Sequence, residues 1–224
     1  MKKTLLFVAL FLTLATSHLL PSLTVICGSM CGGKSAEVIR IVKRAMLSHA
    51  QFLVFKPAID NRKMLDLEQD PLTYIPSRNG NWINCIPVKS CAHMEEIIQA
   101  SHASVIVIDE AHFFTPEANA LIALVRSLVQ SGKKVVIAGL ELDFRGEPFG
   151  PMPQLLAYAD TVLKLTAICS QCGNDTYCLN QRLVDGQPAR YDDQLFVVGS
   201  DQYEPRCRKC HIIRKQEHSS QSSY

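Results

Sequence analysis

Short apolar runs rich in β-branched residues alternate along the chain with segments whose apolar residues recur at helical spacing. The runs are typical of buried strands and the segments of amphipathic helices. The predicted strands lie within residues 23–27, 51–62, 82–88, 104–114, 134–144 and 161–169. The predicted helices lie within residues 35–47, 91–103, 115–133 and 151–160. Strands that alternate with helices predict an α/β fold, a doubly wound parallel sheet with right-handed crossovers.

Two segments carry more local detail. In the helical segment 115–133, Thr115 is the expected N-cap, Pro116 the first helical residue and Glu117 part of the first turn. Residues 64–82 are polar and irregular, with two prolines and an Asn-Gly-Asn turn signal, which predicts a mobile loop.

A glycine-rich loop follows the first predicted strand and precedes the first predicted helix. Gly28, Gly33, Lys34 and Ser35 fit the pattern G-x-x-x-x-G-K-[ST]. In this setting, backbone N–H groups of the loop and of the helix N-terminus bind phosphate oxygens. Lys34 is then expected to reach the β- and γ-phosphates, and the Ser35 hydroxyl to bind Mg²⁺. The alternative is a flexible turn that happens to contain a lysine.

The apolar run 104–108 ends in two acids, Asp109 and Glu110. An acid at the carboxyl end of a buried strand completes a nucleoside-triphosphate site, because it lies beside the phosphate loop and holds Mg²⁺ through water. Asp109 is the candidate for the metal. Glu110 is the candidate general base that takes a proton from an attacking hydroxyl or water. The alternative for Glu110 is a surface carboxylate.

Size and composition narrow the class of protein. The chain has 224 residues, 47% of them hydrophobic and 20% charged, which is typical of a globular protein. Its length allows one α/β domain and a small second one. The net charge is +2 and the pI about 8.1, so the sequence shows no strong electrostatic footprint for nucleic acid.

The N-terminal residues 1–20 form a leader-like apolar extension that begins with two lysines. Its length approaches that of a membrane span. However, the phosphate loop begins within ten residues of its end, and ATP-dependent chemistry needs a nucleotide supply. We therefore expect a cytoplasmic enzyme without a membrane anchor, whose extension is either an early-assigned start or an unusual addition.

Nine cysteines are distributed unevenly along the chain. Four form two C-x-x-C pairs, Cys169 with Cys172 and Cys207 with Cys210. This spacing predicts a structural zinc site of four thiolates, which would pin both ends of the long loop between the pairs. The alternatives are two redox pairs, or disulfides in a secreted protein. We expect Cys27 and Cys31 to fill the core and the loop without binding metal, and Cys178 to be dispensable for the zinc site.

The composition changes at Cys169, where turn-forming residues replace helical periodicity. We therefore expect a P-loop nucleotide-binding kinase domain at residues 21–168, a small zinc-anchored domain at 169–211 and a disordered polar tail at 212–224.

Four motifs together resemble the thymidine kinase family of bacteria, animal cytosol and poxviruses. They are GSMCGGKS, DEAHFF, KLTAICSQC and GSDQYEPRCRKCH, in that order, and the resemblance covers roughly residues 23–211. The last motif is specific, because a glycine, an acid and a tyrosine precede C-R-x-C at fixed offsets. The resemblance implies a P-loop α/β fold with a small C-terminal zinc-binding domain, whose lasso loop closes over the nucleoside.

The resemblance also assigns roles to residues. It implies that Glu110 is the catalytic base. The ATP-binding positions it implies are Gly28, Ser29, Met30, Cys31, Gly32, Gly33, Lys34, Ser35, Asp60, Arg62, Asp109, Ala111 and His112. The thymidine-binding positions it implies are Met30, Phe113, Leu140, Phe144, Thr166, Leu195, Phe196, Val197, Val198, Gly199 and Tyr203. The zinc ligands it implies are Cys169, Cys172, Cys207 and Cys210, and the magnesium ligands are Ser35 and Asp109.

The expected activity is ATP-dependent phosphorylation of thymidine, and more weakly of deoxyuridine, at the 5′-hydroxyl, by a homotetramer that salvages nucleosides for DNA synthesis. The chain departs from the family pattern in several places. Cys31 and Gly32 replace an aromatic-then-small pair, His112 replaces a common glutamine, LELDF (140–144) differs from the common L-D-x-x-F with its acid two positions off, and the leader is foreign to the family. The main rival is a P-loop ATPase whose zinc domain grips nucleic acid. Near-neutral charge and few aromatic residues around the cysteines count against it.

Overall fold

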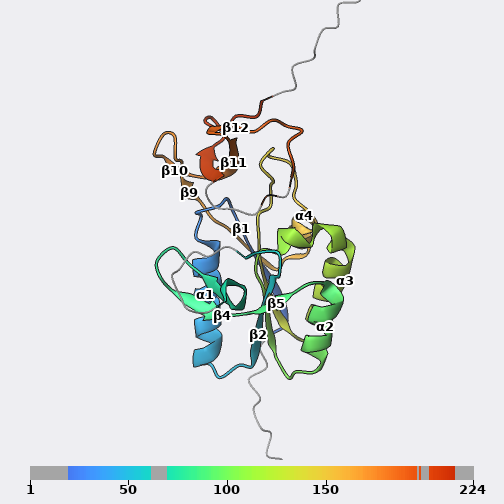
Figure 1. Ribbon diagram of the computed structural model, residues 1–224. Coiled ribbons are helices and arrows are strands. Elements are labelled where there is room, and N and C mark those ends of the chain that lie inside the picture. Colours follow the sequence, from blue (N-terminus) through green and yellow to red (C-terminus); the bar gives the residue numbers. More distant parts are fainter. Residues whose placement is uncertain (1–19, 62–69, 196, 198–201, 215–224) are drawn as a thin grey trace, which may run out of the picture.

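A central sheet of six parallel strands organises the computed structural model, which describes residues 20–61, 70–195, 197 and 202–214 (Figure 1). The strands lie in the order β5-β2-β6-β7-β1-β8, and every neighbouring pair is parallel. Their bounds are β1 Ser22–Cys27, β2 Phe52–Pro57, β5 Ile86–Val88, β6 Val105–Ile108, β7 Lys134–Ala138 and β8 Thr161–Lys164. This confirms the predicted α/β fold with a parallel sheet.

Helices cover both faces of this sheet. Helix α1 (Lys34–Leu47) lies on one face, and α2 (Cys91–Gln99) and α3 (Ala118–Gln130) lie on the other, with the short α4 (Met152–Tyr158) above them (Figure 1). Strand β1 shows why both faces are apolar. Its Val25 and Cys27 join the cluster under α2, α3 and α4, whereas Ile26 joins the cluster under α1. Successive side chains of a strand point to opposite faces, so a doubly covered strand must be apolar throughout.

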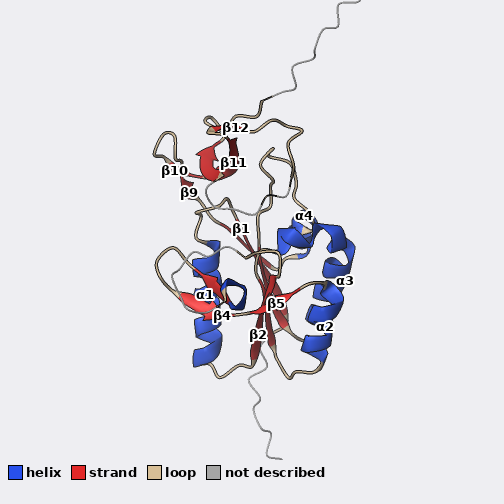
Figure 2. Cartoon of the chain, in the orientation of Figure 1, coloured by secondary structure: helices blue, strands red, loops and turns tan. Residues whose placement is uncertain are grey.

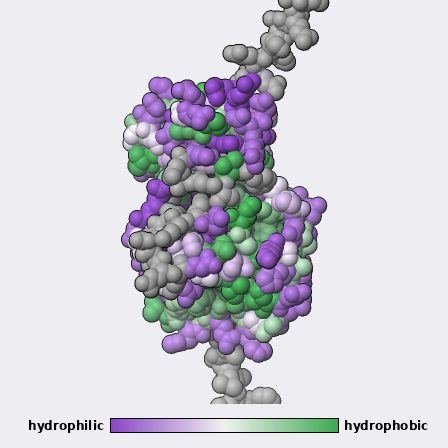
Figure 3. Space-filling view, viewed as in Figure 1, coloured by the Kyte–Doolittle hydropathy of each residue, from purple (hydrophilic) through white to green (hydrophobic). Residues whose placement is uncertain are grey.

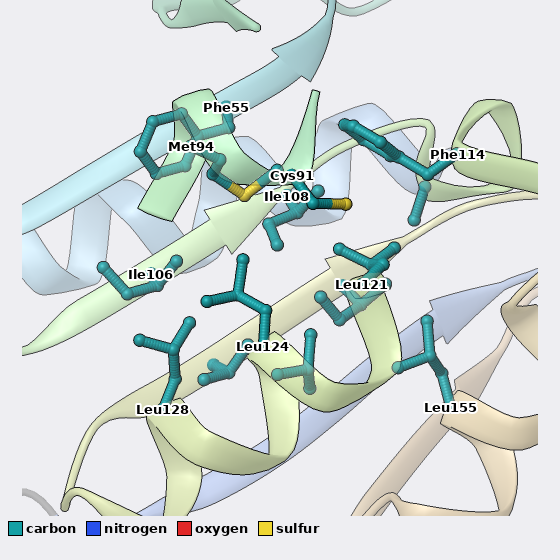
Figure 4. Close-up of a cluster of buried hydrophobic side chains, with 14 of the residues drawn as sticks. Phe55, Cys91, Met94, Ile106, Ile108, Phe114, Leu121, Leu124, Leu128 and Leu155 are labelled. Atoms are coloured by element: carbon teal, nitrogen blue, oxygen red, sulfur yellow. The ribbon is translucent and has the colours of Figure 1, made fainter. Parts of the chain in front are cut away.

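The larger of the two clusters is shown in Figure 4. Leucines of α3 pack there against isoleucines of β6, with Phe55 of β2 and Met94 of α2 beside them. Leu121 and Ile106 are completely buried. Burial of this apolar surface stabilises the sheet and fixes the carboxyl ends of its strands in space.

The predicted start of the third helix is wrong. Residues Ala111–Glu117 form a 3₁₀ helix, η2, and α3 begins only at Ala118. Thr115 does not cap α3, because its hydroxyl donates to the carbonyl of His112 at 2.7 Å. Pro116 lies inside η2. The Glu117 carboxylate instead accepts the N–H of Cys91, at the start of α2.

Part of the predicted mobile loop is ordered. Strand β3 (Tyr74–Pro76) pairs with β4 (Trp82–Asn84) in an antiparallel hairpin, preceded by a 3₁₀ turn, η1 (Pro71–Thr73). Tyr74 is fully buried, with its ring edge-on to Trp82, and Ile75 packs into the cluster under α1. The hairpin therefore covers the end of α1. Residues 64–69 of this loop lie outside the described residues.

Two other predicted strands are divided. Residues 82–88 give β4 and β5, which belong to different sheets, and residues 161–169 give β8 and β9 (Ala167–Ile168). Strand β7 ends at Ala138, well before the predicted end at Phe144. The chain joins the central sheet at β5 and leaves it after β7 and β8, and residues that follow β7, among them Leu140 and Phe144, line the site.

The described residues of 167–214, which we call the C-terminal segment, form strands and loops at one end of the molecule (Figure 2). Strand β9 pairs with β10 (Asp175–Thr176), while β11 (Cys178–Val184) lies between β12 (Gln187–Pro188) and β13 (Tyr203–Cys207). Hydrophilic side chains cover much of this part in the view of Figure 3. The expected tail lies outside the described residues from 215 onward, and Ile212 hydrogen-bonds to Gln181 through its N–H and its carbonyl.

None of the helices within the described ranges is both long enough and apolar enough to span a membrane.

Candidate active site and metal centre

A cavity of about 320 Å³ opens where the strands of the central sheet end. The loop after β1, the residues after β6, the loop after β7 and the β3–β4 hairpin all contribute side chains, and strand β11 of the C-terminal segment contributes Asn180. Ligands of open α/β sheets bind at this edge, because the loops of several strands converge there.

The glycine-rich loop has the backbone geometry that the motif predicts. Gly28 has a φ of 132°, and a Cβ there would lie 2.6 Å from the carbonyl oxygen of Leu165, so only glycine fits. Gly33 has a φ of 86° and begins α1 without a side-chain cap. The first N–H groups of a helix have no intrahelical partner. The first turn of α1 can therefore bind an anion.

Lys34 is buried at the floor of the loop. Its Nζ donates to the carbonyls of Gly28 at 2.9 Å and Ser29 at 2.8 Å. Lys34, Ser35, Met30, Cys31 and Gly33 all line the cavity. The ammonium group is thus held inside the loop, at the place where the motif expects the terminal phosphates.

Asp109 and Glu110 both line the cavity opposite Lys34. Strand β6 ends at Ile108, so the two side chains are not forced to opposite faces. Burial and the neighbouring Glu110 carboxylate raise the pKa of Asp109 to about 7. A divalent cation would favour the ionised form. Glu110 has left-handed backbone angles, with a φ of 50°, which are uncommon for a residue with a side chain and occur at functional sites.

His112 is buried between the rings of Phe113 and Phe149. Its Nδ1 accepts the N–H of Leu140 at 3.2 Å. The Glu110 carboxylate lies 3.5 Å from the same Nδ1. His112 thus positions the loop after β7. The sequence, which shows only that a histidine replaces a common glutamine at this position, does not suggest this role.

Asp60 enters the cavity from the end of β2. Its carboxylate lies 3.4 Å from Nζ of Lys56, and both side chains are buried. Lys56 also donates to the carbonyl of Pro71 at 3.1 Å, which ties β2 to the start of the hairpin. The sequence offered no signal for Lys56, because a lysine within an apolar strand belongs to no motif. Arg62, the other candidate of this segment, lies outside the described residues.

The cavity also has a group of largely apolar lining residues. The predicted thymidine-binding residues that line it are Met30, Phe113, Leu140, Phe144, Leu195, Val197 and Tyr203. The predicted residues Phe196, Val198 and Gly199 lie outside the described residues. The carbonyl of Thr166 lies beside Gly32, near the back of the phosphate loop, and Thr166 is not among the residues that line the cavity.

The four C-x-x-C cysteines converge. Their sulfur atoms all lie within 4.8 Å of one another, and the sulfurs of Cys172 and Cys207 are 3.8 Å apart. Zinc–thiolate bonds of about 2.3 Å in a tetrahedron separate the sulfurs by about 3.8 Å. The Cys207 amide donates to the Cys169 sulfur and lowers the pKa of that thiol to about 6. This donor set fits a soft divalent cation such as zinc.

The remaining cysteines behave differently. Cys27 belongs to the core, Cys31 is exposed in the phosphate loop, and the buried Cys178 donates to the carbonyl of Ala167 at 3.4 Å. The side chains of Asn180 and Glu141, which sequence reasoning missed, hydrogen-bond to the phosphate loop. The Asn180 amide oxygen accepts the N–H of Met30, and the Glu141 carboxylate accepts the N–H of Gly28.

Comparison with protein-family models agrees with this geometry. The model described as thymidine kinase matches residues 21–211, which include the phosphate loop, both acids and all four metal-site cysteines. The match begins at the first strand of the sheet and ends one residue after the last cysteine of the cluster. A kinase transferase is the class of enzyme to which these features belong. The chain is therefore a member of the thymidine kinase family.

Proposed function

We propose that the protein transfers the γ-phosphoryl group of ATP to the 5′-hydroxyl of thymidine and gives dTMP, with deoxyuridine as a weaker substrate. One observation carries the proposal. Lys34, Asp109 and Glu110 line a single cavity together with a group of apolar side chains, in a chain of the thymidine kinase family. The cavity can therefore hold a triphosphate and a nucleoside together.

The charged lining residues suit the phosphates of the donor. The N–H groups of the first turn of α1 and the Lys34 ammonium group provide positive charge for the transferring group. Ser35 and Asp109 would hold Mg²⁺, which neutralises charge on the β- and γ-phosphates when it is bound with ATP. The remaining ATP-binding candidates of the proposal are Gly28, Ser29, Met30, Cys31, Gly32, Gly33, Asp60, Arg62, Ala111 and His112.

Glu110 is the proposed general base. Its carboxylate is buried, lines the cavity and follows the metal-side candidate Asp109 directly. A carboxylate in this position can accept the proton of the 5′-hydroxyl as that oxygen attacks phosphorus. Because Glu110 has left-handed backbone angles, the direction of its side chain does not follow the alternation of side chains along β6.

The apolar lining residues suit a pyrimidine nucleoside. Met30, Phe113, Leu140 and Phe144 supply the apolar surface, and Tyr203 closes the cavity from the C-terminal segment. We include Thr166 and residues 195–199 in the proposed nucleoside site on the strength of the family resemblance. A pocket that accommodates one methyl group discriminates by only about 1–3 kcal/mol. Deoxyuridine should therefore react more slowly without being excluded.

Three further features belong to the proposal. Zinc at Cys169, Cys172, Cys207 and Cys210 would have a structural role, because four protein ligands leave no open position for substrate. The C-terminal zinc domain would begin at Cys169. We also propose a cytoplasmic homotetramer acting in nucleoside salvage for DNA synthesis, as the family resemblance implies.

A nucleoside panel tests the function. Purified protein is incubated with Mg²⁺, γ-labelled ATP and thymidine, deoxyuridine, deoxycytidine or a purine deoxynucleoside, and labelled monophosphate is measured. We expect transfer to thymidine, slower transfer to deoxyuridine and none above background to the others. Lys34→Ala serves as the inactive control. Transfer to a purine nucleoside in preference to thymidine, or none to any nucleoside, would refute the proposal.

A further inference from the structure

We propose that Asn180 and Glu141 are positioning residues for the phosphate loop, and that through them the C-terminal segment holds this loop in the shape that binds ATP. The inference rests on the proposed function. It adds a link between the metal centre and the phosphate loop, whereas the expected role of zinc concerns only the loop over the nucleoside.

Asn180 makes the direct contact. It lies on β11, is 3% exposed, and its Oδ1 accepts the N–H of Met30 at 2.8 Å. Its Nδ2 donates to the carbonyl of Leu142 at 3.1 Å, so the orientation of the amide is set from both ends. A buried amide with both groups bonded is held firmly. Met30, which belongs both to the phosphate loop and to the apolar lining residues, is thereby fixed in place.

Glu141 makes the second contact, with help from the C-terminal segment. Its Oε2 accepts the N–H of Gly28 at 2.7 Å, and its Oε1 accepts the hydroxyl of Tyr177 at 2.8 Å. Burial raises the pKa of Tyr177, so its hydroxyl keeps the proton that it donates. Lys164 lies 3.5 Å from the same carboxylate and compensates its charge. Each end of the loop's first turn is thus bound to a buried side chain.

These contacts divide the N–H groups of the loop into two sets. The N–H groups of Gly28 and Met30 are bonded to the protein, and that of Gly32 donates to the carbonyl of Ser29 at 3.2 Å. The first turn of α1 remains for the phosphates. A loop whose shape is set before the ligand arrives loses less conformational entropy on binding. The two acceptors therefore strengthen ATP binding through the shape of the loop.

Strand β11 connects both contacts to the metal centre. Tyr177 directly precedes this strand and Asn180 lies within it. In the pairing of β11 with β13, Cys178 lies opposite Cys207, and Asn180 lies opposite Pro205. A metal ion bound to Cys169, Cys172, Cys207 and Cys210 would hold β13 and β9 together. It would thereby fix the register from which Asn180 and Tyr177 reach the phosphate loop.

A matched pair of variants tests the proposal. Gln181 is also a buried amide of β11 bonded to main chain, but it contacts Ile212 and not the loop. We compare Asn180→Leu with Gln181→Met, two nearly isosteric apolar replacements, and measure equilibrium binding of a non-hydrolysable ATP analogue with Mg²⁺ and without nucleoside. Loss of one hydrogen bond of about 1.4 kcal/mol predicts tenfold weaker binding for Asn180→Leu. We expect less than a twofold change for Gln181→Met, with the zinc content of both variants equal to that of wild type.

Wild-type binding by Asn180→Leu, or equal losses in both variants, would overturn the proposal. Amide hydrogen exchange of Met30 in the wild-type protein gives a second test that needs no variant. We expect slow exchange in the metal-loaded protein, and exchange at least tenfold faster after zinc is chelated. Fast exchange before chelation, or no change after it, would also overturn the proposal. Neither result bears on whether wild-type protein phosphorylates thymidine, so failure of the proposed function remains distinguishable.

Discussion

Glu110 is the residue on which the proposed chemistry depends most. Its carboxylate is buried in the cavity. Its backbone adopts left-handed angles, which residues of ordinary α-helices and β-strands do not adopt. Glu110→Gln keeps the size and the hydrogen-bonding ability of the side chain but removes its basicity. We expect kcat for thymidine to fall by about 10²–10⁴-fold, the usual contribution of a general base, with little change in ATP-analogue affinity.

Steady-state kinetics and equilibrium binding check this prediction. The control is Glu95→Gln, because Glu95 is exposed on α2 and lies outside the cavity. A Glu110→Gln protein with wild-type kcat would remove Glu110 from its proposed role. A variant that also lost ATP-analogue binding would indicate that the side chain holds the loop and not the proton.

Cysteine reactivity gives a second test at this scale. Burial raises the pKa of Cys27 to about 11, and of Cys85 and Cys91 to about 12, so these thiols stay protonated at pH 8. Cys31 is exposed in the phosphate loop. Because thiolates react and inaccessible thiols do not, we expect iodoacetamide to label Cys31 first in the zinc-loaded protein.

Peptide mass spectrometry after brief labelling measures the order of reaction. MgATP should slow labelling of Cys31, because the nucleotide would cover the loop, and Cys31→Ser should remove the fast phase. Labelling of Cys27 before Cys31 would contradict the burial of the β1 strand. Labelling of Cys31 at the same rate with saturating MgATP would show that the loop does not bind phosphates.

Sequence motifs predicted the residues whose signals are local. Lys34 was identified by its spacing from Gly28 in the sequence, and Glu110 by its place at the end of an apolar run. The four zinc-site cysteines were identified by the spacing within each C-x-x-C pair. Glu141 and Asn180 could not be found in this way. Their partners in the phosphate loop lie 113 and 150 residues away, and a single acid or amide carries no spacing signal.

Among the elements, the buried ammonium group of Lys56 connects strand β2 to the segment that begins the β3–β4 hairpin. Lys56 is 2% exposed, and its ammonium group contacts the Asp60 carboxylate and the Pro71 carbonyl. Lys56→Met would leave a carboxylate and a carbonyl buried with one partner fewer. Breaking a buried pair from one side costs about 3–5 kcal/mol, and we expect the free energy of unfolding to fall by that amount.

Urea unfolding at pH 7 measures the change. The double variant Lys56→Met with Asp60→Asn should recover part of the lost stability, because it removes the buried carboxylate as well. Lys133→Met is a control, since Lys133 is only half-buried and donates to the carbonyl of Ala103. If Lys56→Met unfolds at the wild-type urea concentration, the pair does not anchor the hairpin.

Element type was predicted best where the periodic pattern was long. The helix within 35–47 was recognised because its buried face must be apolar. The strand predicted within 104–114 is correct only over Val105–Ile108, because Ala111–Glu117 form the 3₁₀ helix η2. The hairpin was missed because β3 and β4 have three residues each, too few for alternation to show. The start of α3 was misplaced because Thr115 and Pro116 also suit the 3₁₀ turn that precedes it.

At the scale of the whole molecule, the central sheet and the C-terminal segment differ in how much buried apolar surface stabilises them. The central sheet has large apolar clusters on both faces. Helices flank both faces in Figure 1, and Figure 4 shows one of the two clusters. In the C-terminal segment, the described buried cluster consists of Ala167, Cys169, Cys178 and Cys207, with Cys210 beside it. A cluster this small cannot offset the entropy of ordering the segment, so a bound metal must supply much of its stability.

Zinc removal should therefore act on one part of the molecule. After chelation, we expect the C-terminal segment to become sensitive to protease, while far-UV circular dichroism stays nearly unchanged because the helices α1 to α4 flank the sheet. Thymidine kinase activity should fall together with the zinc content and return with added Zn²⁺ but not with added Mg²⁺, since thiolate ligands favour the softer ion. Analysis of metal content should give one zinc per chain. Unchanged protease resistance after complete loss of zinc would mean that the four sulfurs are held together by the fold alone, and the metal would then have no role in shaping the site.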